Sequence, residues 1–356
     1  GGSLVLDGTS TGLTFTRDLS LQGLGPISDR SSALMSVGNN TLTGTVAISQ
    51  PTSGTNVNTR ITSGDGMLNF SSASTLNVLG TAATTLSTLG GTNQTGAVGY
   101  NLAGTITGPG TYEKAGAGTL FLNPTNVSGF AGTLRVTSNS VTGTQGTIRI
   151  TNPNVIGSRV GTGASSIVDL NAGFMELRMN TPSLQTTGGT NANIYSRSNT
   201  NATLFVDHGL GGSAVNQTLT LGEFGFAANA ATTFTSRNGY NITFGAAPVV
   251  TGDNSATITN SMAGTLSFTG AFWSNANNTA ARTMTIAGNG NTLVSGNITA
   301  SSAAFDHILT KSGSGSLTVT STGSTLDGAV NVQGGALRIT DFRSITNNTS
   351  TISLGN

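Results

Sequence analysis

Short runs in which apolar and polar residues alternate are the main pattern along this chain. The clearest lies between residues 114 and 136, where GTLFL and GTLRV are joined by a segment rich in turn-forming residues. Because side chains alternate between the two faces of a strand, Leu120 and Leu122 point to one face, and Leu134 and Val136 repeat the pattern. The segment therefore predicts two strands separated by a turn.

A similar phrase returns at Lys311, in the last part of the chain. It begins KSGSGSLTV and ends GGALRI, and looser variants occur from LVLDG near the start of the sequence to TISLG near its end. No segment shows the period of an amphipathic helix. We therefore expect an all-β protein built by repetition of one strand-and-turn unit.

The most regular section predicts how the strands stack. TLTLG, NITFG, TLSFTG and TMTIAG follow one another, and their first apolar residues are Leu219, Ile242, Leu266 and Met284. The spacing between these residues is roughly 20 residues, enough for about three short strands. This spacing is typical of one coil of a parallel β-helix. The second apolar residues of these runs would stack inside successive coils; they are Leu221, Phe244, Phe268 and Ile286. This step predicts one continuous solenoid over residues 1–356, with roughly 17–18 coils and repeat-like submodules of about residues 1–160 and 161–356.

Composition narrows the class of protein. Apolar content is 35%, below the globular average of about 45–50%, which often indicates disorder; the alternating runs predict strands instead. A net charge of +1 with scattered Lys and Arg provides no basic patch for nucleic acid. No apolar run approaches the roughly 18 residues of a membrane span. The absence of cysteine excludes disulfides and thiolate chemistry, and is compatible with a secreted bacterial protein.

The phrase at Lys114 follows a spaced pattern of lysine, glycines and alternating apolar residues. Its positions are Lys114, Gly116, Gly118, Thr119, Leu120, Leu122, Asn126, Ser128, Gly129, Gly132, Thr133, Leu134 and Val136. The copy at Lys311 matches at Gly313, Gly315, Leu317, Val319, Gly335, Leu337 and Ile339, without the Asn turn. These positions resemble the autotransporter-associated β-strand repeat of autotransporter passenger regions and very large bacterial surface proteins. The resemblance implies a right-handed parallel β-helix, an extracellular or bacterial cell-surface location, and a structural or adhesive role.

The two ends of the sequence read as halves of one repeat. Placed before GGSLVLDG, the last residues give STISLGNGGSLVLDG, which aligns with SSIVDLNAGFMEL so that Ile352 matches Ile167. Our hypothesis is that these residues form one period of a longer array, or one subunit of an end-to-end fibre, whose partner is a further copy or flanking repeat of itself. The predicted stacking residues are Leu4, Leu6, Ile352 and Leu354. An arbitrary boundary within a long solenoid is the alternative.

Candidate catalytic chemistry is sparse. Asp207–His208 and Asp306–His307 are the two Asp–His pairs, and such pairs can serve general-base chemistry. Because neighbours on a strand point to opposite faces, neither pair forms a dyad within itself. The 13 acidic residues are dispersed, and no calcium-binding repeat or EF-hand loop is present. We expect no catalytic, cofactor-binding or metal-binding residues and no cofactor, although coils can bring distant acids together.

For three arginines and one tryptophan, the sequence predicts whether the side chain lies on the outer surface. Arg135, Arg149 and Arg338 each follow an apolar residue inside a strand-like run, so we expect them on the outer face, where charge blunts lateral association of sheets. Trp273 is the only tryptophan, and packing in the core is its expected role. An exposed Trp273 would instead be a contact for a partner or a sugar.

Together these patterns predict a structural module of a secreted or cell-surface bacterial fibre or giant repeat protein, which stacks end to end through its terminal coils. The alternative is an adhesin stalk or passenger domain that binds a host or surface glycan, which an exposed aromatic or charged cluster on one face would favour. A polysaccharide-degrading β-helix enzyme is the third hypothesis. It needs a groove with two or more acids in reach of each other.

Overall fold

The computed structural model contains two compact units, one formed by Gly1–Glu176 with Gln185–Gly188 and the other by Leu177–Leu184 with Gly189–Asn356. The described residues are 2–23, 32–49, 58–79, 83–88, 99–126, 130, 132–137, 145–151, 167–180, 193–196, 200–222, 224–226, 229–245, 255–275, 280–300, 305–341 and 351–355. They contain strands and no helix. Every strand pairing between them for which a register is defined is parallel. The protein is thus an all-β solenoid, as the alternating pattern predicted.

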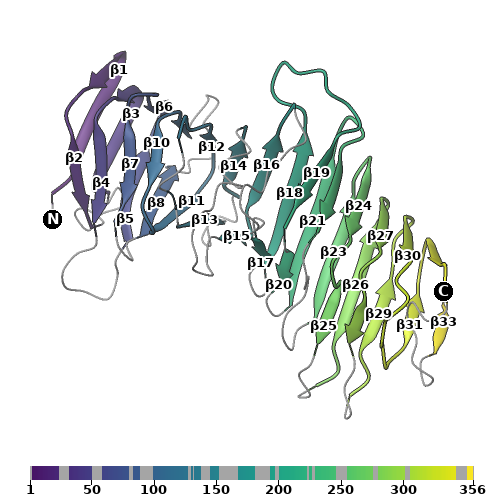
Figure 1. Ribbon diagram of the computed structural model, residues 1–356. Helices are drawn as coiled ribbons and strands as arrows, with labels where there is room; N and C mark the ends of the chain where they lie inside the picture. Colours follow the sequence, from purple (N-terminus) through teal and green to yellow (C-terminus); the bar gives the residue numbers. More distant parts are fainter. Residues whose placement is uncertain are drawn as a thin grey trace. The chain divides into compact units, whose positions relative to one another are not determined.

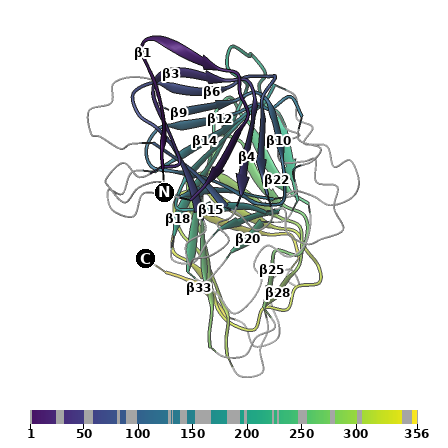
Figure 2. The same cartoon turned by 90° about the vertical axis from the view of Figure 1, so that its left-hand side faces the viewer.

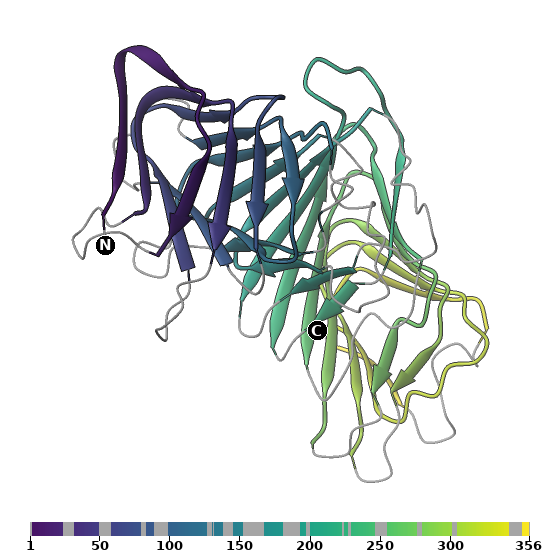
Figure 3. The same ribbon diagram turned by 60° about the vertical axis from the view of Figure 1, so that its left-hand side comes forward.

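Strands of the first unit lie side by side, each hydrogen-bonded to the strand one coil away (Figures 1 and 2). One group comprises β1 (Leu4–Phe15), β3 (Leu34–Leu42), β5 (Asn58–Ser63), β6 (Met67–Phe70), β8 (Ala83–Thr88), β9 (Gly99–Leu102), β11 (Thr111–Ala115), β12 (Thr119–Leu122), β13 (Thr133–Thr137), β14 (Thr147–Ile150), β15 (Ile167–Asn171) and β16 (Phe174–Arg178). A second group comprises β2 (Leu19–Gln22), β4 (Thr45–Ser49), β7 (Thr75–Val78) and β10 (Thr105–Thr107). Figure 3 shows the purple and blue strands of this unit lying next to one another.

The second unit repeats this arrangement. One group comprises β17 (Asn193–Ser196), β18 (Asn201–Asp207), β20 (Phe224–Phe226), β21 (Ala230–Ser236), β23 (Ala256–Ser261), β26 (Thr283–Gly288), β29 (Ile308–Lys311), β31 (Val330–Val332) and β33 (Ile352–Leu354). A six-stranded sheet comprises β19 (Thr218–Leu221), β22 (Asn241–Phe244), β24 (Thr265–Phe268), β27 (Asn291–Val294), β30 (Ser316–Val319) and β32 (Ala336–Ile339). β25 (Trp273–Asn275) and β28 (Ile298–Ala300) form a separate pair.

Most coils are longer than the sequence suggested. Gly99 stacks on Thr119, which is close to the expected step, but Leu134 stacks on Val168 and Leu4 on Leu34. The length of a coil varies because the connections between strands differ in length, whereas the strands themselves stay short. The prediction of roughly 17–18 coils assumed a uniform step of about 20 residues and is therefore too high.

Alternation between inside and outside is as predicted. In β12, Leu120 and Leu122 are buried while Thr119 and Phe121 are half-exposed, and β13 repeats the pattern. This arrangement buries one apolar row of each strand against the same row of the next coil, which is how a solenoid obtains a continuous core from short strands. Ser128 of the Asn turn between these two strands lies outside the described residues, as does Gly129.

The predicted ladder of stacked apolar residues in the second unit is confirmed at three of its four positions. Leu221, Phe244 and Phe268 stack in register on β19, β22 and β24, and the rings of Phe244 and Phe268 lie 5.4 Å apart and nearly parallel. The next residue in this ladder is Val294, not the predicted Ile286. Ile286 is buried in the neighbouring sheet, where it pairs with Ile258. The error arose because the TMTIAG run resembles the preceding runs but belongs to a different face of the coil.

Candidate functional site

The corner between β11 and β12 contains a buried lysine. Lys114 is fully buried, and its Nζ donates hydrogen bonds to the carbonyl oxygens of Ala115, Gly116 and Ala117 at 2.7, 2.9 and 2.9 Å. An ammonium group has three donors, so these three bonds use all of them. Burial lowers the pKa of Lys114 to about 7, while the carbonyls oppose that change by favouring the charged form. Lys114 therefore ties the corner together from inside.

The second lysine of the repeated phrase does the same at the corner between β29 and β30. Lys311 is buried, and its Nζ donates to the carbonyl oxygens of Ser312, Gly313 and Gly334 at 2.6, 3.0 and 3.3 Å. Burial also lowers the pKa of Lys311. Gly116 and Gly313 both have a φ of +72°, a conformation that side chains disfavour. The glycines of the repeat thus allow the chain to turn, and the lysine has a structural role that its position in the sequence did not indicate.

Asparagines take the place of lysine at two other corners. The Nδ2 of Asn40 donates to the carbonyls of Leu6 and Val37 at 3.0 and 2.9 Å, and its Oδ1 accepts from the Leu13 amide at 3.0 Å. Asn260, also buried, accepts from the Met262 amide and donates to the Asn291 carbonyl. These interior polar groups satisfy backbone atoms that the ladder hydrogen bonds leave free at the bends.

Charged side chains meet on the outer face of the first unit. Arg135 lies in register between Glu113 on β11 and Asp169 on β15, with its Nε 2.8 Å from Asp169 Oδ2 and its Nη1 3.4 Å from Glu113 Oε2. Nearby, Arg149 pairs with Glu176 and lies 5.0 Å from the centre of the Phe121 ring.

The predicted outward position of Arg135 and Arg149 is thus confirmed, and Arg338 is exposed on β32. The sequence did not indicate the acidic partners of Arg135, which lie on other coils, far from it along the chain. Because Arg135 occupies the space between Glu113 and Asp169, these two acids do not face each other across a groove.

Asp207 and His208 do not form a catalytic dyad. The Asp207 carboxylate is buried and accepts hydrogen bonds from Arg178 Nη1 at 2.9 Å, Asn238 Nδ2 at 2.6 Å and the His208 amide at 2.9 Å. The Nδ1 of His208 donates to the Gly209 carbonyl at 2.7 Å, and its Nε2 is 4.0 Å from Asp207 Oδ1. Three donors therefore fix the carboxylate at the end of β18, and the imidazole is oriented by a backbone carbonyl.

The second pair is split between the two faces of the coil, as predicted. Asp306 is exposed and His307 is fully buried. His307 Nδ1 accepts a hydrogen bond from the Arg282 amide at 3.2 Å, and its ring lies 5.8 Å from that of Trp273. Trp273 is itself fully buried, which confirms its expected place in the core and removes it as a surface contact for a sugar.

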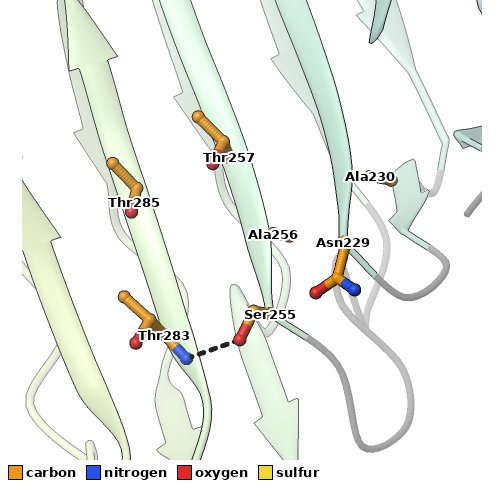
Figure 4. Close-up of a pocket in the computed structure, with 7 residues that line it drawn as sticks. All are labelled: Asn229, Ala230, Ser255, Ala256, Thr257, Thr283 and Thr285. Carbon is orange, nitrogen blue, oxygen red and sulfur yellow. Dashed lines mark hydrogen bonds between the residues drawn. The ribbon is translucent and has the colours of Figure 1, made fainter. Parts of the chain in front are cut away.

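One shallow groove of 180 Å³ lies on the outer face of the second unit (Figure 4). Its lining residues are Asn229, Ala230, Ser255, Ala256, Thr257, Thr283 and Thr285. They include no acid, base or aromatic ring, and the Ser255 hydroxyl accepts a hydrogen bond from the Thr283 amide at 3.1 Å. Among the described residues, no group of three or more acidic or histidine side chains could hold a metal ion. The same residues contain no helix that could span a membrane.

The N-terminal edge strand carries two of the predicted stacking residues. In β1, Leu6 is buried and Leu4 is half-buried, and both face the same side as their partners in β3. Val5 on the opposite face is 53% exposed, and Leu13 farther along β1 is also exposed. β1 is paired with β3 on one side, and no described strand pairs with its other side.

The C-terminal edge strand leaves the ladder open. Ile352 and Leu354 of β33 stack on Val330 and Val332 of β31, and they are 40% and 82% exposed although Val330 is fully buried. Ile352 and Leu354 therefore lie on the inward side of β33, whereas the inward residues of β15 are Val168 and Leu170. The alignment of Ile352 with Ile167 is thus wrong by one residue. A slip of one residue exchanges the two faces of a strand. Leu354 is thus largely exposed, whereas Val332, on which it stacks, is half-buried.

No family model, curated protein or solved structure matches the chain.

Proposed function

We propose that this chain is a structural solenoid module that stacks end to end through its terminal coils, as part of a secreted or cell-surface bacterial fibre or giant repeat protein. The observation that carries the proposal is the open apolar ladder at the edges. Ile352 stacks on the buried Val330 and Leu354 on the half-buried Val332, yet no described strand covers them. Unpaired edge strands are templates for further strands, which natural proteins usually block.

The described side faces of the solenoid offer a partner fewer binding groups than the edge strands do. The charged side chains of Arg135, Arg149 and Arg178 are paired with acids of neighbouring strands. Outward positions such as Thr257 and Thr285 are small and uncharged. Mechanical continuity is therefore the role best supported, since long ladders of parallel strands and buried apolar rows run through both units.

The location outside the cell is part of the same proposal. It is supported by the resemblance of the Lys114 phrase to a surface-protein repeat and by the absence of cysteine. An exterior rich in Ser, Thr and Asn, in a chain with only 14 Lys and Arg, presents few cleavage sites for trypsin-like proteases. Two of those cations, Lys114 and Lys311, are buried at corners and further reduce the number.

A tandem of two full chains, with Asn356 joined directly to Gly1, tests the stacking. Amide hydrogen exchange is measured in the tandem and in the single chain at the same low concentration. We expect the amides of β33 in the first copy and of Val5 in the second to exchange at least about tenfold more slowly in the tandem, because paired edges open less often. Unchanged exchange at both edges would overturn the proposal. The central strand β12 serves as the internal control, since its exchange should not change.

The other two hypotheses have weaker support. An adhesin needs an exposed aromatic or charged cluster, but Trp273 is buried and the arginine clusters pair internally. A polysaccharide-degrading enzyme needs acids in reach of each other in a groove, and the groove in Figure 4 is lined by hydroxyl, amide and methyl groups.

A further inference from the structure

The last coil of the second unit has a first strand without a second strand beside it. In the two preceding coils, β29 is followed by β30 and β31 by β32, and the strands stack as β29–β31 and β30–β32. β33 then stacks on β31, but no described strand stacks on β32. Leu337 and Ile339 of β32 are only half-buried, although the residues below them, Leu317 and Val319, are buried. Within the described part of the chain, the edge of β32 that faces away from β30 therefore has no paired strand.

Backbone hydrogen bonds show which groups of β32 face the open position. The Ala336 amide donates to Gly315 and the Thr340 amide donates to Val319, both at 3.2 Å. Peptide groups alternate in direction along a strand, so the N–H and C=O of Leu337 and Ile339 point away from β30. These four backbone groups are the ones that a further parallel strand would pair with.

The edge of β1 has the complementary arrangement. The Leu4 amide donates to Ala33 on the β3 side at 3.0 Å. By the same alternation, the N–H and C=O groups of Ser3, Val5 and Asp7 point to the free side of β1. A residue that faces a parallel neighbour bonds to the two residues flanking its partner. Leu337 therefore fits opposite Leu4, with bonds to Ser3 and Val5.

We propose that residues 3–7 of one copy of this chain add in parallel to the free edge of β32 in a second copy, with Leu4 opposite Leu337 and Leu6 opposite Ile339. This inference rests on the proposed end-to-end function and specifies its partner and register. The apolar rows then run without a break through Leu317, Leu337 and Leu4 to Leu34. The contact joins two different surfaces, so it does not form a symmetric dimer, and its repetition along the direction of strand stacking builds a filament.

Sequence pattern supports this register independently of exposure. The two stacked strands in the second unit read GSLTV at residues 315–319 and GALRI at residues 335–339, and they pair residue for residue. Residues 2–6 read GSLVL, with a small residue, an inward leucine, an outward residue and an inward apolar residue in the same order. The added strand is thus a third copy of the pattern that already stacks twice.

Cysteine cross-linking tests the register directly, because the chain has no cysteine of its own. Val5 and Arg338 are exposed, point outward and would lie directly opposite each other. Adjacent strands are about 4.8 Å apart, a separation that a disulfide can bridge. The variants V5C and R338C are prepared separately, mixed and oxidised mildly. We expect a disulfide-linked heterodimer, identified by mass spectrometry of the joined peptides.

Controls separate the register from unspecific collision. V5C mixed with T318C, whose cysteine lies one strand farther from the edge, should give at least about tenfold less cross-linked product. Preferential formation of V5C–V5C or R338C–R338C dimers would overturn the proposal, because it indicates that like ends meet. Absence of the V5C–R338C product, under conditions in which the joined tandem shows edge protection, would also overturn it. In that case the end-to-end function stands, but the edge is filled only by a segment of the same chain.

A charge series provides a second readout without any change inside the core. V5K places a like charge opposite Arg338, and V5E places an opposite charge there. Direct cross-strand charge pairs change pairing by about two- to fivefold in the association constant. Sedimentation of the full chain should therefore rank self-association as V5E above wild type above V5K, with R338E reversing the order of V5E and V5K. An unchanged order in the R338E background would count against this register.

Discussion

Lys114, at the corner between β11 and β12, and Lys311, at the corner between β29 and β30, each use their Nζ to hold three backbone carbonyls. Neither lysine has a carboxylate among these partners. The positive charge is held by peptide dipoles alone, within a buried site.

Replacement of Lys114 by Met should destabilise the first unit. Methionine has about the right length and volume, but it leaves the carbonyls of Ala115, Gly116 and Ala117 without their donor. Loss of a partner for a buried polar group costs about 1–3 kcal/mol, and relief of the buried charge offsets part of it, so we expect a net loss of about 2 kcal/mol. Urea unfolding measures the change. R338M, at an exposed arginine, is the matched control and should change the free energy by less than about 0.5 kcal/mol.

Stability should rise with pH between about 7 and 10. The pKa of Lys114 is about 7 in the folded chain and 10.5 in the unfolded chain, so the unfolded state binds more protons in this window. At about 1.36 kcal/mol per pKa unit, the gain is on the order of 4 kcal/mol from this residue. The destabilisation caused by K114M should therefore grow over the same window. A constant difference between wild type and K114M from pH 7 to pH 10 would contradict the buried, weakly basic lysine.

Above pH 10 the trend should reverse because of two tyrosines. Burial raises the pKa values of Tyr100 and Tyr112 above their ordinary value of 10.0. The unfolded state then loses protons that the folded state keeps, so stability falls as pH rises. Tyr100 accepts from the Ser63 amide and donates to the Ile61 carbonyl, both at 2.9 Å. Y100F should weaken the alkaline decline but cost about 1–3 kcal/mol at neutral pH, since it leaves both groups unpaired; pH-dependent unfolding of the two chains measures both effects.

Truncation of Arg135 should cost more than its exposure alone suggests. The Asp169 carboxylate beside it is 4% exposed, so R135A leaves a nearly buried charge without this partner. We expect a loss of about 1–2 kcal/mol, reduced from the larger cost of a fully buried pair because Arg135 itself is partly exposed. The double variant R135A/D169A should recover part of the loss. If it is as unstable as the sum of the single variants, the pair is not coupled.

Trp273 provides a spectroscopic test of the second unit. It is the only tryptophan, it is fully buried, and it lies beside His307. Its emission should be blue-shifted and resistant to iodide quenching in the folded chain, and should move to longer wavelength on unfolding. Red-shifted, readily quenched emission from the folded protein would place the ring at the surface. L210A, at a leucine that is 65% exposed, should leave the emission unchanged.

The alternation of residues by itself determined that the protein is built of strands and which side of each strand faces inward. Leu120, Leu122, Leu134 and Val136 are buried as predicted because the alternation of side chains is a property of the extended backbone. The outward position of Arg135 and Arg149 follows from the same local rule. These are properties that a strand carries with it wherever it packs.

Only the tertiary structure decided which strands are neighbours. The connections vary, so Phe268 stacks on Val294 and not on Ile286, and Arg135 meets acids on two other coils. A lysine side chain is charged and is usually exposed to solvent. Lys114 is buried because three backbone carbonyls at the corner accept hydrogen bonds from its Nζ. Register and corner geometry are fixed by contacts between coils, and a single sequence read along its length contains no measure of which coil lies next to which.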